Sequence, residues 1–130
     1  VLLSAGVGIT PMIGALNRIA LVNPQRRVIF AHAARCAEHH PHQADIAAAQ
    51  ARMPNLEVVT FHEEGNAPGA LPGFMDLARL PTWSRSETNV YMCGPLPFMQ
   101  AQWNALLADS APAERLHREV FGPDLLDNLI

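Results

Sequence analysis

The chain of 130 residues contains no lysine, so all 9 of its basic side chains are arginines. These arginines form no cluster, and the formal net charge is −3. Nucleic-acid binding requires a basic face that neutralises phosphates, so the sequence argues against a nucleic-acid partner. No apolar run is long enough to cross a bilayer, and no positive flank precedes the first apolar residues. We therefore expect neither a membrane partner nor a signal peptide.

Cysteine is also scarce, with only Cys36 and Cys93 present, in no metal-binding or disulfide spacing. This usage is typical of a reducing compartment and predicts a cytoplasmic protein. The G-x-S-x-G motif is missing as well, which disfavours a hydrolase on a similar sheet. The remaining composition, 49% apolar and 16% charged, is typical of one globular domain. Because the sequence opens directly on an apolar run, we expect residues 1–130 to be a domain from a longer protein.

Apolar runs alternate with amphipathic stretches along the whole chain. Residues 63–73 hold three glycines and two prolines and are predicted to be a loop, and the helix at 97–109 is predicted to be the longest. Strands are expected at 1–4, 28–31, 56–61, 89–93 and 116–120, with helices near 12–20, 44–53, 74–80 and 97–109. This alternation predicts an α/β fold, a three-layer open sheet of about five parallel strands with helices on both faces. Such a sheet is a Rossmann-like nucleotide-binding domain.

A turn with two glycines, Gly6-Val7-Gly8-Ile9-Thr10-Pro11, joins the first strand to the first helix. Glycine permits a tight turn and a close approach by a ligand, and a helix start directs unpaired N–H groups at an anion. Thr10 is predicted to be the N-cap and Pro11 the first helical residue. The turn is a candidate pyrophosphate site. An ordinary strand-to-helix turn remains the alternative, because Pro11 replaces the third glycine of G-x-G-x-x-G.

A second candidate site ends the fourth strand, at Tyr91-Met92-Cys93-Gly94-Pro95. In a doubly wound sheet this strand should neighbour the first at the topological switch point. Cys93 would then stand at the mouth of the crevice, and Gly94 would let a flat ligand come close. Alternatively, Cys93 is a small buried apolar residue and the glycine and proline are ordinary turn residues.

Taken together, three segments carry a family resemblance that extends over essentially the whole chain. They are Ala5 to Met12, Cys93-Gly94-Pro95 with Phe98 and Met99, and Glu119-Val120-Phe121-Gly122-Pro123. In this order they resemble signatures of the ferredoxin-NADP reductase superfamily, and most closely the reductase module of flavohaemoglobins. The segment at 73–77 is similar to that family too.

The resemblance implies a role for each matching residue. Gly6, Gly8 and Thr10 would hold the pyrophosphate, Cys93 and Gly94 would line the nicotinamide, Glu119 would lie near the junction of nicotinamide and flavin, and Phe121 would pack against the flavin. The other predicted cofactor-binding residues are Val7, Pro11, Pro95, Phe98 and Met99. Cys93 and Glu119 are the candidate catalytic residues. Hydride would pass from the nicotinamide to FAD, and single electrons would pass on to haem in a globin domain. The complete protein of this kind is a nitric oxide dioxygenase.

The same resemblance places the FAD in a preceding β-barrel domain, to which nothing in this sequence corresponds. The isolated chain is therefore expected to bind a dinucleotide weakly and to catalyse little, because a protein does not replace its cofactor's chemistry. One alternative is the reductase component of a multicomponent oxygenase, which feeds an iron–sulfur protein. A second alternative is a non-catalytic nucleotide-binding module.

The choice of dinucleotide depends on the end of the second strand, where His32 and Arg35 are predicted to lie near the adenosine ribose. Arg35 favours the 2′-phosphate of NADPH, whereas Glu63 and Glu64 oppose it. We predict NADH as the cofactor, with NADPH as the alternative. The run His39-His40-Pro41-His42 invites a metal interpretation, but further ligands are wanting and no metal is predicted.

Overall fold

A computed structural model describes residues 1–36, 40–65 and 67–119 of the chain. Strands and helices alternate within those ranges. In chain order the elements, with η for a 3-10 helix, are β1 (Leu2–Ala5), η1 (Gly6–Gly8), α1 (Ile9–Val22), β2 (Val28–Ala34), α2 (Gln43–Arg52), β3 (Leu56–His62), β4 (Ala70–Pro72), η3 (Leu77–Arg79), β5 (Val90–Cys93), α3 (Leu96–Ala108), η4 (Ala113–Arg115) and β6 (Leu116–Glu119).

The strands of the described residues form one six-stranded sheet in the order β4-β3-β2-β1-β5-β6, and every neighbouring pair is parallel. From β1 the chain builds outward through β2 and β3 to β4. It then returns to pair β5 with the other edge of β1. The order of building therefore reverses between β1 and β5, which makes the carboxyl ends of these two strands the topological switch point.

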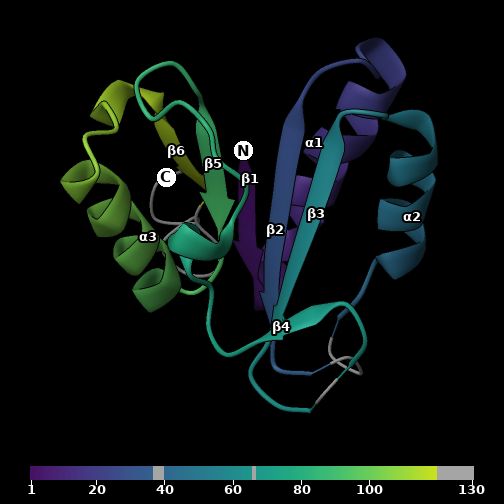
Figure 1. The fold of residues 1–130 in the computed structure, drawn as a ribbon, viewed down its shortest axis with the longest axis horizontal. Coiled ribbons are helices and arrows are strands. Elements are labelled where there is room, and N and C mark those ends of the chain that lie inside the picture. Colours follow the sequence, from purple (N-terminus) through teal and green to yellow (C-terminus); the bar gives the residue numbers. More distant parts are fainter. Residues whose placement is uncertain (37–39, 66, 120–130) are drawn as a thin grey trace, which may run out of the picture.

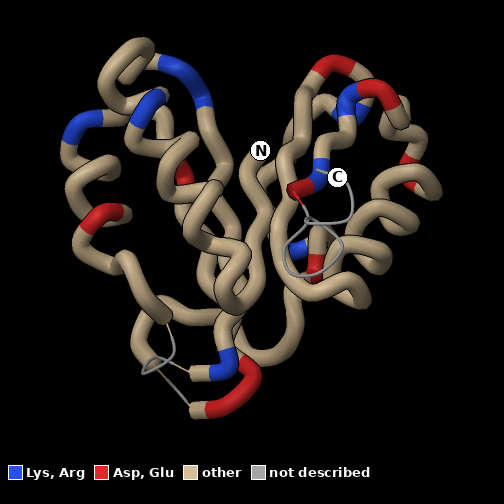
Figure 2. Tube along the Cα trace, turned by 180° about the vertical axis from the view of Figure 1, so that it is seen from behind, with Lys and Arg blue, Asp and Glu red and all other residues tan. Residues whose placement is uncertain are grey.

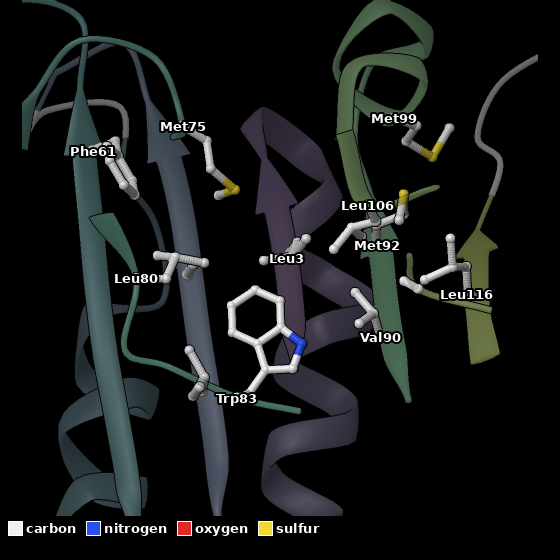
Figure 3. Packing of buried hydrophobic residues seen from close by; sticks show 13 residues of the cluster. Leu3, Phe61, Met75, Leu80, Trp83, Val90, Met92, Met99, Leu106 and Leu116 are labelled. Carbon is white, nitrogen blue, oxygen red and sulfur yellow. The ribbon is translucent and has the colours of Figure 1, made fainter. Parts of the chain in front are cut away.

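Helices cover both faces of this sheet, with α1 and α2 on one side and α3 on the other (Figure 1). Consecutive strand residues point to opposite faces, so Leu2 joins the apolar cluster under α1 while Leu3 joins the cluster under α3. Figure 3 shows Leu3 of β1 and Val90 of β5 among the side chains of the second cluster. Burial on both faces explains why the strands appear in the sequence as continuous apolar runs.

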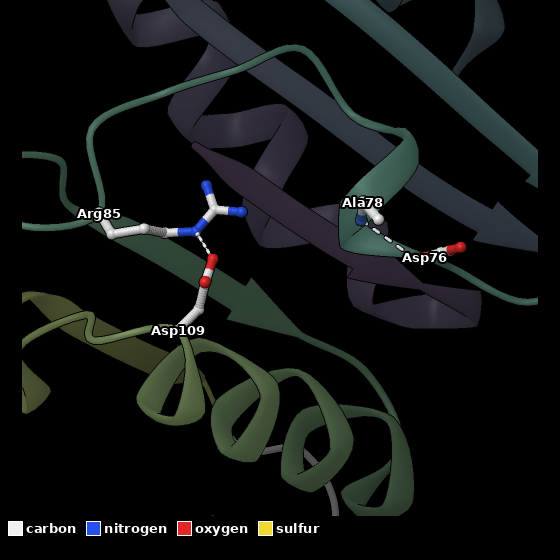
Figure 4. A network of polar contacts seen from close by, with 4 residues as sticks. All are labelled: Asp76, Ala78, Arg85 and Asp109. Atoms are coloured by element: carbon white, nitrogen blue, oxygen red, sulfur yellow. Dashed lines mark hydrogen bonds and ion pairs between the residues drawn. The ribbon is translucent and has the colours of Figure 1, made fainter.

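The crossover between β4 and β5 lies on the same face as α3, and Trp83 packs in its cluster (Figure 3). The Arg85 guanidinium lies 3.7 Å from the centre of the Trp83 ring, and its Nε donates to Asp109 at the end of α3 over 2.6 Å (Figure 4). In the same crossover the Asp76 carboxylate accepts from the Ala78 N–H over 3.0 Å and caps η3. These contacts fix the crossover against α3.

The predicted parallel α/β sheet with helices on both faces is confirmed, but the described residues contain six strands instead of five. The additional strand, Ala70–Pro72, lies in the segment predicted to be a loop. It pairs with β3 over only three residues, which is too short to produce a periodic pattern. Pro72 has no N–H to donate, which suits an edge position.

Two helix predictions are wrong. The helix expected at 74–80 is only the single turn Leu77–Arg79, because Asp76 caps it on one side and Pro81 restricts Leu80 on the other. The longest helix is α1 with 14 residues, against 13 in α3. Because η1 leads directly into it, α1 begins at Ile9, earlier than the apolar spacing indicates.

Arginines and acidic residues are interspersed along the chain, as Figure 2 shows. None of the helices in the described part of the chain has the length and apolarity that crossing a bilayer requires.

Candidate functional site

A cavity of about 480 Å³ lies at the carboxyl ends of the strands, where the topological switch point was located above. Its lining comes from the ends of β1, β2 and β3, from the segment after β4, and from the start of α3. The lining residues are Ala5, Gly6, Ala33, Ala34, Arg35, Glu63, Phe74, Met75, Pro95, Pro97, Phe98, Ala101 and Gln102. Five residues given a role in the sequence analysis therefore meet at one cavity: Gly6, Arg35, Glu63, Pro95 and Phe98.

The two glycines of the first turn, Gly6 and Gly8, have different structural roles. Gly6 has a φ of +57°, a left-handed conformation that favours glycine, and a Cβ built on it meets no atom within 4 Å. Gly8 is buried, and a Cβ there would overlap the carbonyl group of Cys93 and lie 2.6 Å from the Gly94 nitrogen. Gly6 thus leaves space at the cavity, whereas Gly8 lets the start of α1 pack against the end of β5.

The rest of this turn differs from the sequence prediction. Gly8, not Thr10, is the N-cap of α1, and no side chain caps this helix end. Thr10 and Val7 are exposed, and Pro11 falls in the first helical turn, where its missing N–H costs nothing. The prediction of Thr10 as N-cap is wrong because the turn Gly6–Gly8 is itself helical and moves the start of α1 forward.

The end of β5 brings Cys93 and Glu119 together, since the two residues pair directly across β5 and β6. The Cys93 side chain is fully buried in the cluster under α1 and does not line the cavity. Burial first, and the nearby Glu119 charge second, raise the pKa of the Cys93 thiol to about 11. Cys93 is therefore a neutral thiol at physiological pH, and the structure gives it no acid–base role.

This burial makes Cys93 slow to react with thiol reagents. We expect iodoacetamide to alkylate half-buried Cys36 well before Cys93 in the folded chain, because the thiolate is the reactive form and Cys93 is both covered and protonated. Peptide mass spectrometry of timed samples measures the two rates. Urea-unfolded chain is the control, in which both cysteines should react at similar rates. Fast labelling of Cys93 in the folded chain contradicts the geometry.

Several other candidates do not reach the cavity with their side chains. His32 and Met99 are buried, with exposed fractions of 0% and 2%, and Gly94 packs against the Phe98 ring. The expected contact of His32 with a ribose is therefore not available in this geometry, because its side chain points under α1 and α2 instead of towards the cavity. Phe121 lies outside the described residues.

Arg35 lies at the cavity rim and is held by a neighbouring acid. Its Nε lies 3.3 Å from Oε1 of Glu64, and both side chains are largely exposed. Glu63 lines the same cavity. The arginine that could receive a 2′-phosphate is thus already paired, with a second carboxylate close by.

Phe74, Met75 and Gln102 also line the cavity. Phe74 and Met75 belong to the family-like segment 73–77, but no role was predicted for any of the three. Phe74 is 77% exposed, an unusual state for a large aromatic residue. It follows Gly73, whose φ of +96° turns the chain at this point. A glycine directly before an aromatic residue, between a short strand and a turn, was the available signal.

Sequence reasoning also missed a buried group formed by His32, His40 and His62. His62 lies 22 residues after His40, and it reaches the other two histidines because β2 and β3 are neighbours. Within residues 1–36, 40–65 and 67–119, no three His, Cys, Asp or Glu side chains are grouped so as to hold a metal ion.

A larger cavity of about 540 Å³ lies at the opposite end of the sheet, beside Val1, Arg18 and Tyr91. It lies at the amino ends of the strands. In open parallel sheets ligands bind beyond the carboxyl ends, so we assign the functional site to the smaller cavity.

The family model of the oxidoreductase NAD-binding domain matches residues 2–103. The flavohemoprotein of Bordetella pertussis is 40% identical over 135 residues, which cover 94% of this chain and 32% of that protein. Among solved structures, the flavohem-like FAD/NAD binding domain of nitric oxide dioxygenase from Vibrio cholerae O1 biovar El Tor is 33% identical, with a TM-score of 0.86 over 94% of this chain and 50% of that one. Flavohemoglobin from Malassezia yamatoensis, solved with bound FAD and heme, shares the fold at 23% identity and a TM-score of 0.82, over 93% of this chain and 31% of that one.

The chain spans about a third of the length of the curated relatives that it matches. The parallel sheet, the cavity at its switch point and the extent of the family match agree with one another. The chain belongs to the oxidoreductase NAD-binding domain family, and it matches the reductase module of flavohaemoproteins.

Proposed function

We propose that the chain binds NADH in the cavity at its switch point and presents the nicotinamide to FAD held mainly by another domain of the same parent protein. The observation that carries this proposal is the meeting of Gly6 and Pro95, from the two candidate turns, at one cavity. A bound nicotinamide supplies a hydride, and a flavin accepts it and releases electrons singly. The chain's own residues bind the dinucleotide and orient it.

The lining of the cavity suits a dinucleotide. Gly6 leaves open space next to the start of α1, where unpaired N–H groups attract a pyrophosphate and the first turn holds no acidic residue. Phe98 on one side and exposed Phe74 on the other offer aromatic surfaces for flat rings. An apolar cleft with a few charged groups at its rim is typical of cofactor sites.

Cys93 and Glu119 are proposed to flank the point of hydride transfer. Their pairing across β5 and β6 places both at the carboxyl edge next to Pro95. Because Cys93 is buried, we assign it a positioning role through its backbone, against which Gly8 packs. Glu119 is exposed at the same edge and is the proposed residue at the junction with the flavin.

NADH is the proposed cofactor because Glu64 already pairs with Arg35 and Glu63 lines the cavity. A 2′-phosphate would meet carboxylates at this rim, and a like-charge contact disfavours binding. The relatives further support a haem acceptor in a globin domain of the parent protein. A cytoplasmic, reducing location is proposed from the cysteine usage of the sequence, two residues in no disulfide spacing.

The test is an NMR titration of the chain with NADH, NADPH and flavin mononucleotide, taken to about millimolar concentrations because weak binding is expected. The proposal expects shifts of the amide signals of Gly6, Arg35 and Gly94 with NADH and smaller shifts with NADPH. A folded sample that shows no shift with either dinucleotide contradicts it. A response to the free flavin alone would point to a flavin-binding module.

The same titration tests the proposed preference for NADH. Glu64→Gln removes the partner of Arg35 and should improve NADPH affinity about two- to fivefold, the scale of one exposed charge pair. Glu57→Gln is the matched control. It removes the same charge from an exposed pair with Arg27 elsewhere on the sheet. Equal changes of NADPH affinity in the two variants would show that net charge, and not the Arg35–Glu64 pair, sets the preference for NADH.

A further inference from the structure

Three histidines form a buried group under the carboxyl ends of the strands. His32 of β2, His62 of β3 and His40 just before α2 have exposed fractions of 0%, 4% and 9%. The centres of the His32 and His40 rings lie 4.7 Å apart, and those of His40 and His62 lie 5.7 Å apart. We call these three residues the histidine cluster.

The hydrogen bonds of the histidine cluster are incomplete. His32 Nδ1 lies 2.7 Å from the Ser4 hydroxyl oxygen, and His40 Nδ1 lies 3.5 Å from His62 Nε2. The remaining ring nitrogens, His32 Nε2, His40 Nε2 and His62 Nδ1, have no hydrogen-bond partner among the described residues. Buried polar atoms in this state are rare and call for an explanation.

No described carboxylate neutralises the histidine cluster. On the β1 side, the cluster contacts the uncharged Ser4 hydroxyl. Arg35, which follows β2, is paired with Glu64. On the α2 side, Asp45 is paired with His42 at 2.9 Å. A proton on His32 is therefore opposed by the charges of His40 and His62. Burial first, and the neighbouring histidines second, lower the pKa of His32 to about 3, and burial and His62 lower the pKa of His40.

The histidine cluster lies on the α1 and α2 side of the sheet, next to the strand ends that line the proposed dinucleotide cavity. Ser4 precedes Ala5 and Gly6 of the lining, His32 precedes the lining residues 33–35, and His62 precedes Glu63. Ser4 pairs with His32 in the sheet, and Ala34 pairs with His62. The contacts of the cluster thus hold together the ends of three adjacent strands, each of which continues into the cavity wall.

His40 is the member best placed to leave. It lies in a loop segment before α2, not in a strand, and is the most exposed of the three. Two residues on, His42 has a φ of +64°, a left-handed conformation that is unfavourable for most residues other than glycine. The Gln43 side chain donates to the His40 carbonyl over 3.0 Å, and this contact and the packing of His40 under the strand ends hold the segment in place.

We propose that the histidine cluster is a proton-operated latch on the dinucleotide site. When the imidazoles are neutral, His40 stays buried against His32 and His62. The ends of β1, β2 and β3 then keep the cavity in the shape that binds the dinucleotide. Taking up a proton drives His40 out to water, and the cavity loses its support. The inference rests on the proposed function, because it supplies the regulation of that same site.

The direction of the effect follows from the burial. The closed form favours the neutral ring, so acid favours the open form as pH falls below the ordinary histidine range near 6.5. The affinity for the dinucleotide should therefore decrease as the pH is lowered. By linkage, a bound dinucleotide should in turn make His40 harder to protonate.

The experiment measures the dissociation constant of NAD⁺, which is stable in acid, for the 130-residue chain from about pH 7.5 to about pH 5.5 by NMR titration. We expect affinity to weaken about fivefold or more, the usual lower range for coupled sites. His40→Leu cannot take up a proton and should flatten this profile to less than about twofold. His117→Gln, on β6 and outside the cluster, should keep the profile of the native chain.

A flat profile for the native chain, or an unchanged slope in His40→Leu, overturns the latch. If NAD⁺ fails to bind even at about pH 7.5, the proposed function fails and the latch with it. If His40→Leu does not fold by circular dichroism, His40→Asn replaces it with the same expectation. In the native chain, the signals of residues 40–46 should titrate together with His40, and independent titration would also count against the proposal.

Discussion

Replacing Gly8 with alanine should cost about 3 kcal/mol or more of folding stability and abolish dinucleotide binding. The added methyl would overlap the Cys93 carbonyl group and lie 2.6 Å from the Gly94 nitrogen. Both neighbours are backbone atoms of β5, so no side-chain rotation relieves the overlap. The start of α1 must move away from the sheet, and overpacking of this kind is strongly destabilising. Because the same movement separates the two turns at the cavity, binding should be lost together with stability.

Gly14→Ala is the matched control for this prediction. Gly14 lies within the same helix, and a Cβ there meets no atom within 4 Å. Alanine is the better helix former, so this variant should gain about 0.5–1 kcal/mol. Urea unfolding followed by circular dichroism measures both variants. If Gly8→Ala and Gly14→Ala change the free energy of unfolding by similar amounts, α1 and β5 are not in the close contact described.

Acid should unfold the chain earlier than an ordinary domain of this size, because of His32. Its folded-state pKa of about 3 lies below the ordinary 6.5, so the folded state favours the neutral ring. The contribution of the neutral His32 ring to the free energy of unfolding is complete above pH 6.5. It is lost as the pH falls from 6.5 towards 3. Each pH unit in that window removes about 1.4 kcal/mol, so roughly 3 kcal/mol is gone two units below 6.5. A domain with an ordinary stability of about 5–15 kcal/mol would feel this loss strongly.

Urea unfolding at a series of pH values measures this dependence. The amino-terminal group, whose pKa is lowered from 8.0 to about 6 chiefly by burial, contributes in the same direction but mainly above pH 6. The histidine contribution is therefore read below pH 6. His117→Gln should leave that part of the curve unchanged. A stability that is constant between about pH 6 and pH 4 would be incompatible with a neutral His32 in the folded chain.

The sequence predicted the architecture well because burial on both faces leaves a direct trace. Apolar runs such as 28–31 could be interpreted as parallel strands without any long-range information. The same method could not find β4, whose three residues are specified by pairing with β3 and not by their own composition. Nor could it find that η1 replaces the expected cap at Thr10, since this depends on how closely α1 approaches β5.

Part of the candidate site could also be predicted from the topology of a parallel sheet. Gly6, Arg35 and Pro95 could be placed together because turns after strands share one edge of a parallel sheet, whereas Phe98 was named only by the resemblance. The resemblance assigned Cys93 and Glu119 to one site; the two residues pair across β5 and β6, and their roles stay predictions. The histidine cluster escaped, because only the three-dimensional fold makes neighbours of His32, His40 and His62.

The strand order also has a kinetic consequence. Strands β1, β2 and β3 follow one another along the chain and pair through single crossovers that contain α1 and α2, whereas the contact of Val1 with Asn89 beside β5 spans 88 residues. Contacts of such long range pay a large loop-closure entropy and usually form late. The proposed binding cavity lies across this seam, with Gly6 on one side and Pro95 on the other. We therefore expect the ability to bind a dinucleotide to be acquired only in the last step of refolding, when the two halves of the sheet join.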